Sequence, residues 1–147
     1  MIRHNGAREV EWWKVRVSRA CPVPLLTCRV EAGFPSPADD SIEEGLDLND
    51  YVIQHPAATF FVRVAGHSMT GAGIHPGDIL VVDRALEPQH GRVVIAVVEG
   101  ELTVKRIHKS RKRVVLLPDN PDYPPLPLDP DGEFSIWGVV TYVIHAL

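Results

Sequence analysis

Two residues with reactive side chains, Ser68 and Lys105, are the strongest candidates for chemistry in this sequence. Ser68 lies in Gly66-His67-Ser68-Met69, directly after a run of β-branched and aromatic residues that predicts a strand. A serine at such a strand-to-loop corner can expose its hydroxyl. Because serine is also common as a plain turn residue, the local motif does not by itself indicate catalysis.

Lys105 is unusual because it lies inside a mainly apolar stretch, Leu102 to Ile107, that predicts a strand. Side chains alternate along a strand, so Lys105 shares a face with Thr103 and Ile107. If that face is partly buried, desolvation lowers the lysine pKa, and a neutral amine can take the proton of a serine hydroxyl. The alternative is a lysine at a sheet edge whose ammonium group reaches solvent.

Other catalytic templates are absent from the sequence. It contains no G-x-S-x-G, no S-x-x-K and no H-E-x-x-H motif, which excludes several common hydrolase classes. His67 precedes the serine, but adjacent strand residues point to opposite faces, so a Ser-His pair is geometrically poor. The seven histidines show no metal-ligand spacing with cysteines or carboxylates, and we expect neither a metal nor another cofactor.

The elements that must position these residues are short strands. From Thr59 onward, runs of Val, Ile and aromatic residues alternate with turn-forming clusters, which is typical of all-β domains. Glu99-Gly100 predicts a tight hairpin turn, and Pro118 to Pro130 predicts a long surface connection. The sequence therefore predicts a mostly β, curled and antiparallel-rich fold. Its six expected strands lie near Thr59–Val64, Ile79–Asp83, Arg92–Val98, Leu102–His108, Val114–Leu117 and Phe134–Ile144.

The first part of the chain has a different character. Residues 1–31 show no sustained periodicity, so we expect a flexible N-terminal arm with one short extended piece around Trp12 to Val17. Residues 33–37, with the sequence Gly-Phe-Pro-Ser-Pro, indicate an exposed linker, because their prolines prevent regular pairing. Asp47 can cap a short helix from Leu48 to about Gln54.

Charge and composition exclude several classes of function. Residues 1–31 carry six Lys/Arg against three Asp/Glu, whereas residues 32–147 carry nine against sixteen. An acidic body argues against a large phosphate-binding face, so we expect little direct DNA binding. Cys21 and Cys28 form no disulfide framework, and no apolar stretch reaches the roughly 18 residues of a membrane span. We therefore expect a cytoplasmic protein without a membrane contact.

The two candidate residues belong to a longer series of motifs that runs through the chain. The motifs are Ala32-Gly33-Phe34-Pro35-Ser36-Pro37, Leu46-Asp47-Leu48-Asn49, Ile53-Gln54-His55-Pro56, Gly66-x-Ser68-Met69, Gly77-Asp78, Val82-Asp83, His90-Gly91, Gly100-Glu101-x-Thr103-Val104-Lys105 and Trp137-Gly138-Val139-Val140. In these motifs the chain resembles the UmuD-type SOS mutagenesis proteins and, more loosely, the self-cleaving peptidase domain of LexA and phage repressors. The resemblance covers about residues 32–147.

This resemblance implies a self-cleaving serine peptidase with a Ser/Lys dyad. Ser68 matches the position of the nucleophile and Lys105 that of the general base, although the position before the serine, often acidic in relatives, is His67 here. Ala32 and Gly33 match the cleaved pair. A small residue before the bond and a glycine after it allow the backbone to enter a narrow cleft as an added strand. The expected division is into an arm, residues 1–32, and a peptidase domain, residues 33–147.

The resemblance also implies partners. A RecA filament on single-stranded DNA would promote the cut during the SOS response to DNA damage. The shortened product, as a homodimer, would join a UmuC-like Y-family DNA polymerase as an accessory subunit in error-prone translesion synthesis. One alternative is a LexA-like repressor fragment, disfavoured because residues 1–31 lack the room and signals for a helix-turn-helix. Another is a non-catalytic polymerase interaction module whose dyad is idle.

Overall fold

The chain forms two compact units, one of Met1–Arg16 and His55–Leu147 and the other of Val17–Gln54. The structure, a computed structural model, describes residues 12–14, 19–26, 30, 32–33 and 42–147. No helix in these ranges is long and apolar enough to cross a membrane.

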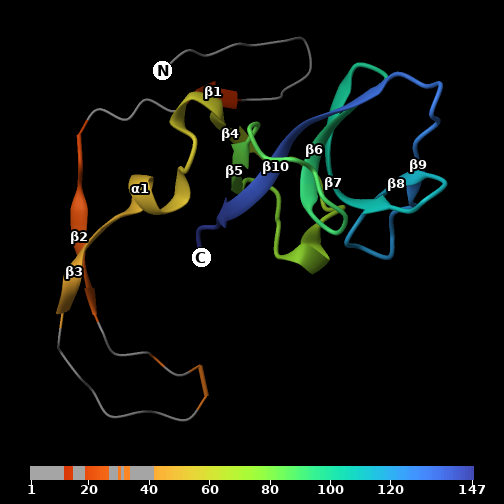
Figure 1. The fold of residues 1–147 in the computed structure, drawn as a ribbon. Helices are drawn as coiled ribbons and strands as arrows, with labels where there is room; N and C mark the ends of the chain where they lie inside the picture. The colour runs from red at the N-terminus through yellow and green to blue at the C-terminus, as the bar shows by residue number, and fades with distance from the viewer. Residues whose placement is uncertain (1–11, 15–18, 27–29, 31, 34–41) are drawn as a thin grey trace. The chain divides into compact units, whose positions relative to one another are not determined.

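The first unit is built on an eight-stranded antiparallel sheet with the strand order β1-β4-β5-β10-β6-β7-β8-β9 (Figure 1). Its strands are β1 Trp12–Lys14, β4 Thr59–Arg63, β5 Ile79–Asp83, β6 Val93–Val98, β7 Glu101–Lys109, β8 Val114–Leu117, β9 Leu126–Pro127 and β10 Phe134–Ile144. The six strands expected from the sequence are all present, with bounds that agree within one residue. The mostly β, antiparallel-rich fold is therefore confirmed. The short strand β9 lies within the expected proline-rich connection.

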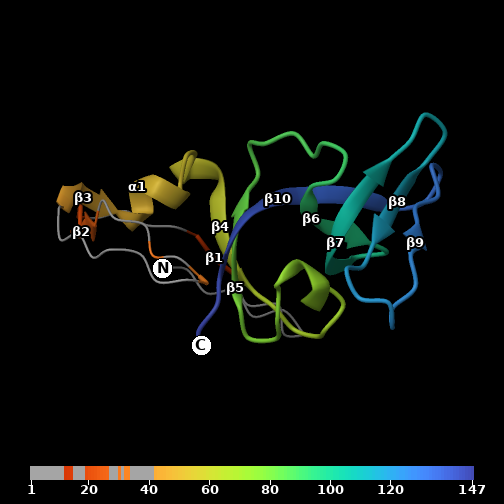
Figure 2. The ribbon, with the colours of Figure 1, turned by 90° about the horizontal axis from the view of Figure 1, so that it is seen from below.

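The long strand β10 is central to this sheet, since it pairs with β5 at one edge and with β6 at the other. Its register shifts between Val140 and Tyr142 against β5, and between Ile136 and Gly138 against β6. Such bulges bend a strand and increase its twist. In Figure 2, β10 accordingly curves as it passes from the β5 side of the sheet to the β8 side.

The core of the first unit consists of two clusters. Ile95 and Val140 belong to one cluster, whereas their chain neighbours Val94 and Val139 belong to the other. Because successive strand residues point to opposite faces, the central strands are buried on both faces. Met69, which follows Ser68, is fully buried in the first cluster. The candidate serine is therefore followed directly by a residue that anchors the main chain in the core.

The predicted hairpin turn between β6 and β7 is confirmed. Val98 pairs with Glu101, which leaves only Glu99 and Gly100 in the loop. Both have positive φ, 51° for Glu99 and 79° for Gly100, as a twist-compatible two-residue loop requires. This turn determines the register of β7, in which Lys105 is paired with Val94.

The second unit contains the predicted short helix. The helix α1, Leu48–Val52, begins after Asp47, whose side chain accepts a hydrogen bond from the Asn49 N–H at 3.0 Å. This is the expected cap, and the helix ends two residues earlier than the sequence suggested.

The second unit also contains a hairpin that the sequence did not predict. Strand β2, Pro22–Leu26, pairs antiparallel with β3, Ile42–Asp47, and the register shifts between Val23 and Leu25. Each strand of a two-stranded sheet keeps one free edge, where the missing N–H of a proline costs no ladder hydrogen bond. The prolines of this segment are therefore compatible with pairing.

Candidate active site

Ser68 lies in the turn between β4 and a short 3-10 helix, η2, Thr70–Ala72. The Asn120 side chain holds this turn at His67, since its Nδ2 donates a hydrogen bond to the His67 carbonyl at 2.8 Å. The Gly71 N–H donates to the carbonyl of Asp119 at 2.6 Å. The turn is thus fastened to the segment after β8 on both sides of the half-buried Ser68.

The segment after β8 is itself held by Arg106. Its guanidinium donates from Nη2 and Nε to Asp119 Oδ2, at 2.6 and 3.0 Å, and from Nη1 to the Gly91 carbonyl at 2.7 Å. Arg106 and Lys105 are consecutive in β7, so their side chains leave the strand on opposite faces. One strand therefore supplies both the candidate base and the anchor of the serine turn.

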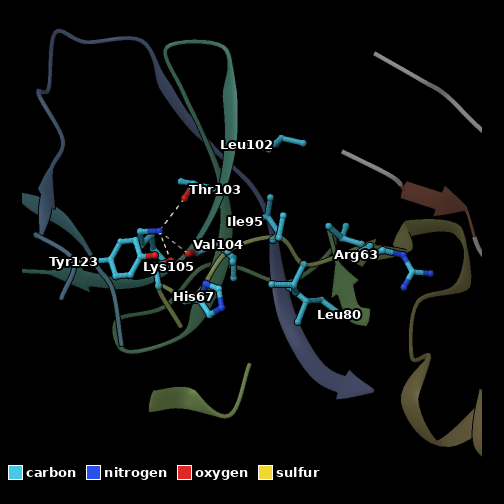
Figure 3. A pocket seen from close by; sticks show the side chains of 14 residues that line it. Arg63, His67, Leu80, Ile95, Leu102, Thr103, Val104, Lys105 and Tyr123 are labelled. Atoms are coloured by element: carbon cyan, nitrogen blue, oxygen red, sulfur yellow. Dashed lines mark hydrogen bonds between the residues drawn. The ribbon is translucent and has the colours of Figure 1, made fainter. Parts of the chain in front are cut away.

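The amino group of Lys105 has three oxygen neighbours. Its Nζ lies 2.8 Å from Ser68 Oγ, 3.1 Å from Thr103 Oγ1 and 3.1 Å from the Val104 carbonyl. Dashed lines in Figure 3 mark the hydrogen bonds of Lys105 to Thr103 and Val104. Desolvation by burial lowers the pKa of Lys105 below its ordinary value. A neutral amine has two N–H groups for Thr103 and Val104, which leaves its lone pair for the serine O–H. The arrangement can therefore move a proton from Ser68 to Lys105.

A cavity of about 270 Å³ lies next to this pair. Its walls come from two segments, residues 62–68 and residues 102–105, together with Leu80, Ile95 and Tyr123 (Figure 3). β7 pairs with β6 from Glu101 to Arg106, whereas its pairing with β8 begins only at Arg106. Among the described strands, none pairs with the second edge of residues 102–105. An extended peptide can add to such an edge.

Ala32 and Gly33, the expected cleaved pair, belong to the second unit, and both are exposed. Gly33 has open space around it, since no described atom lies within 4 Å of the position that a Cβ atom would take there. Residues 34–37 of the expected linker lie outside the described residues.

The Ser-His alternative finds no support in the geometry. The His67 side chain is exposed, and its ring forms no hydrogen bond with Ser68 among the described contacts. The main chain of His67 instead serves the turn, as the acceptor for Asn120.

Comparison with known proteins agrees with this geometry. The Peptidase S24-like family matches residues 24–141, a range that contains Ala32-Gly33, Ser68 and Lys105. The chain belongs to the Peptidase S24-like family. The expected resemblance to the UmuD-type and LexA peptidases is therefore confirmed.

The relatives of this S24-like chain differ in how much of their own length it covers. It is 55% identical to protein SamA of Salmonella typhimurium over 122 residues, which cover 83% of this chain and 84% of SamA. It is 48% identical to protein MucA of Escherichia coli over 126 residues, 85% of this chain and 86% of MucA. With the LexA repressor of Bordetella petrii it shares 40% identity over 122 residues, 82% of this chain but only 53% of LexA. This S24-like chain thus matches SamA and MucA over most of their lengths, and LexA over about half.

Several residues that support the S24-like site were not found from the sequence. Arg106, Asp119 and Asn120 hold the serine turn, yet Asn120 lies 53 residues from the His67 carbonyl that it contacts. Sequence periodicity and motif spacing cannot predict a contact between residues that are so far apart in the chain. Thr103 was placed on the face of Lys105 by strand alternation, and it lies where that pattern predicts.

Proposed function

We propose that this protein is a self-cleaving serine peptidase of the SOS mutagenesis type, which cuts its own Ala32-Gly33 bond with Ser68 as nucleophile and Lys105 as general base. The observation that carries the proposal is the 2.8 Å contact between Ser68 Oγ and Lys105 Nζ, in a chain of a peptidase family. The lowered pKa of Lys105 supports its role as a base.

The proposed reaction has two stages. Ser68 Oγ attacks the carbonyl carbon of Ala32 while its proton passes to the neutral Lys105 amine. The tetrahedral intermediate collapses, Lys105 returns the proton to the Gly33 nitrogen, and Ala32 remains as an ester on Ser68. Water then attacks this ester, and Lys105 takes a proton from the water and returns it to Ser68 Oγ. The products are a carboxylate at Ala32 and an amino terminus at Gly33.

The cavity beside the dyad suits an extended peptide as substrate. As substrate, residues 31–33 would pair with the second edge of residues 102–105, which would bring a main-chain carbonyl to Ser68. A small side chain at Ala32 and none at Gly33 keep the peptide narrow at the cut. Developing negative charge on the carbonyl oxygen needs preorganised donors, and the backbone N–H groups of the Ser68 corner are the proposed source.

Membership of the family supports a proposal for the biological role. We place the cut in the cytoplasm during the SOS response, stimulated by a RecA filament on single-stranded DNA. Residues 33–147 then act as a homodimer and as the accessory subunit of a UmuC-like Y-family polymerase, with little direct DNA binding. Tyr142, Val143 and Ile144 are exposed at the end of β10 and are candidates for the dimer face.

The dyad is tested by two variants and one control. Incubated at alkaline pH without RecA, the wild-type chain should divide into residues 1–32 and 33–147, as intact mass and N-terminal sequencing will show. Ser68→Ala and Lys105→Ala should each abolish the cut, because nucleophile and base act as a unit. Lys109→Ala removes an exposed lysine from the same strand and should cut at the wild-type rate. Cutting by either dyad variant, or a new terminus other than Gly33, would refute the assignment.

The purpose of the cut is tested by complementation of a strain that lacks its own UmuD-type protein. Residues 33–147 expressed alone should restore mutagenesis after ultraviolet exposure, whereas the full-length Ser68→Ala protein should not. Equal restoration by both forms would make the chain a constitutive polymerase accessory protein whose dyad is idle. Specific operator binding by either form would instead favour the repressor alternative.

A further inference from the structure

Three metal-ligating side chains meet on the first unit outside the proposed active site. His75 and Asp78 lie in the connection between η2 and β5, and His145 follows the end of β10. One potential ligand atom from each residue lies within 4.8 Å of those of the other two. The Asp78 side chain is 4% exposed, whereas the two histidine side chains are about half exposed, 47% for His75 and 44% for His145.

The buried carboxylate of Asp78 is the fixed point of this cluster. Its Oδ2 accepts the backbone N–H of His75 at 2.8 Å, and its Oδ1 lies 2.6 Å from His145 Nδ1. The His75 Nδ1 lies 3.8 Å from Oδ2, and the two imidazole rings have centroids 5.1 Å apart. Among the described ion pairs of Asp78, both partners are histidines. The Asp78 carboxylate, which is fixed by the backbone N–H of His75, therefore lies beside the imidazole rings of His75 and His145, and both rings are open to solvent.

We propose that His75, Asp78 and His145 form a binding site for one divalent transition-metal ion of the Zn²⁺ class. Two imidazole nitrogens and one carboxylate oxygen are a common zinc ligand set, with metal-ligand distances of about 2.0–2.2 Å. Tetrahedral bonds of that length set ligand atoms about 3.3 Å apart. The 2.6 Å contact must therefore widen by somewhat less than 1 Å, and the longer separations, which are at most 4.8 Å, must close by at most about 1.5 Å. Rotation of the exposed rings allows these changes.

The chemistry of the ligands also selects against other ions. Ca²⁺ and Mg²⁺ prefer sites built from oxygen, whereas imidazole nitrogen suits Zn²⁺, Ni²⁺ and Cu²⁺. Three protein ligands leave a fourth position for water or for a group from another molecule.

A metal at this site would tie the end of β10 to the main chain that leads into β5. That main chain is paired with the strand segment before Ser68: Val64 N–H donates to the Asp78 carbonyl at 2.8 Å, and Gly77 N–H donates to the Val64 carbonyl at 2.9 Å. An ion that binds only the folded chain stabilises it by mass action. Zn²⁺ should therefore raise the melting temperature of the protein.

The site is tested on the full-length Ser68→Ala protein, so that the result does not depend on self-cleavage. Titration with ZnCl₂ in a calorimeter should show one ion per chain, and Co²⁺ should give the visible absorption of a tetrahedral or five-coordinate centre. Adding His75→Gln or His145→Gln should weaken Zn²⁺ binding at least about tenfold and remove the rise in melting temperature. His108→Gln is the matched control, since His108 is an exposed histidine whose ring contacts that of His90, 4.7 Å away.

The melting temperature without metal shows that each variant is folded. Unchanged Zn²⁺ affinity in both His75→Gln and His145→Gln would overturn the proposal. An equal loss in His108→Gln, or no binding by the parent protein, would overturn it as well.

Discussion

The protonation state of one residue, Lys105, governs what the candidate active site can do. As an ammonium it donates to Ser68, Thr103 and the Val104 carbonyl, and it cannot act as a base. As a neutral amine it still donates to Thr103 and to the Val104 carbonyl, and its lone pair can accept a hydrogen bond from the Ser68 hydroxyl. Desolvation lowers the pKa of Lys105, so the neutral form is present at a lower pH than for a solvated lysine.

A pH dependence of the cut follows from this residue. If neutral Lys105 is the base, the rate without RecA should rise about tenfold per pH unit below the pKa of Lys105 and then level off. Because burial lowers that pKa, the plateau should begin below pH 10.5, the ordinary lysine value. Intact-mass time courses from neutral to alkaline pH will measure it, with circular dichroism as the check on folding. A rate that stays flat or falls over this range would point to a different base.

At the scale of elements, the segment after β8 holds the turn that contains Ser68 through hydrogen bonds. The contact between Gly71 and Asp119 is so close that a Cβ on Gly71 would collide with the Asp119 carbonyl oxygen. The same carbonyl accepts the Gly71 N–H, so it cannot withdraw without losing this hydrogen bond. The glycine is therefore required by the close approach of two main-chain segments.

Gly71→Ala should consequently displace the Ser68 turn. We expect it to lower the free energy of unfolding by about 1–3 kcal/mol, as overpacking does, and to slow the cut. Urea unfolding and the alkaline cutting assay will measure both effects. Leu116→Ala is the control, because Leu116 is fully buried in the second core cluster and its loss should cost about 2–5 kcal/mol. If Leu116→Ala slowed the cut as much as Gly71→Ala, lost stability rather than displacement of the turn would be the cause.

At the scale of the whole molecule, the proposed cut separates a strand from its sheet. Strand β1 lies in residues 1–32, and its residues Trp12, Trp13 and Lys14 pair with Val62, Phe61 and Phe60 of β4. Loss of β1 would leave β4 as an edge strand with unpaired N–H and C=O groups. Such an edge can pair with another chain.

Hydrogen exchange can detect this change. The amides of β4 that face β1 should exchange faster in residues 33–147 alone than in the intact Ser68→Ala protein. The amides of β4 that face β5 are an internal control, because the β4-β5 pairing does not depend on the arm. Equal protection of the β1-facing amides in both forms would contradict the expectation that the cut uncovers β4.

The sequence by itself was enough to determine most of the elements of the first unit. Alternation, turn residues and caps act between residues a few positions apart, so the six main strands, the Glu99-Gly100 turn and the Asp47 cap could be predicted from local patterns. The same patterns placed Lys105 and Thr103 on one face of a strand. The prolines of β2 concealed the β2-β3 hairpin, because their tolerance depends on which edge of the strand stays free.

The tertiary structure alone decided which elements meet. Ser68 and Lys105 are 37 positions apart, and their 2.8 Å contact depends on how β4 and β7 are placed by the strand order and by the two bulges of β10. His145 lies 67 positions from Asp78, and only the pairing of β10 with β5 brings them together. Strand order and register arise from the packing of the whole core, and no pattern confined to neighbouring residues contains them.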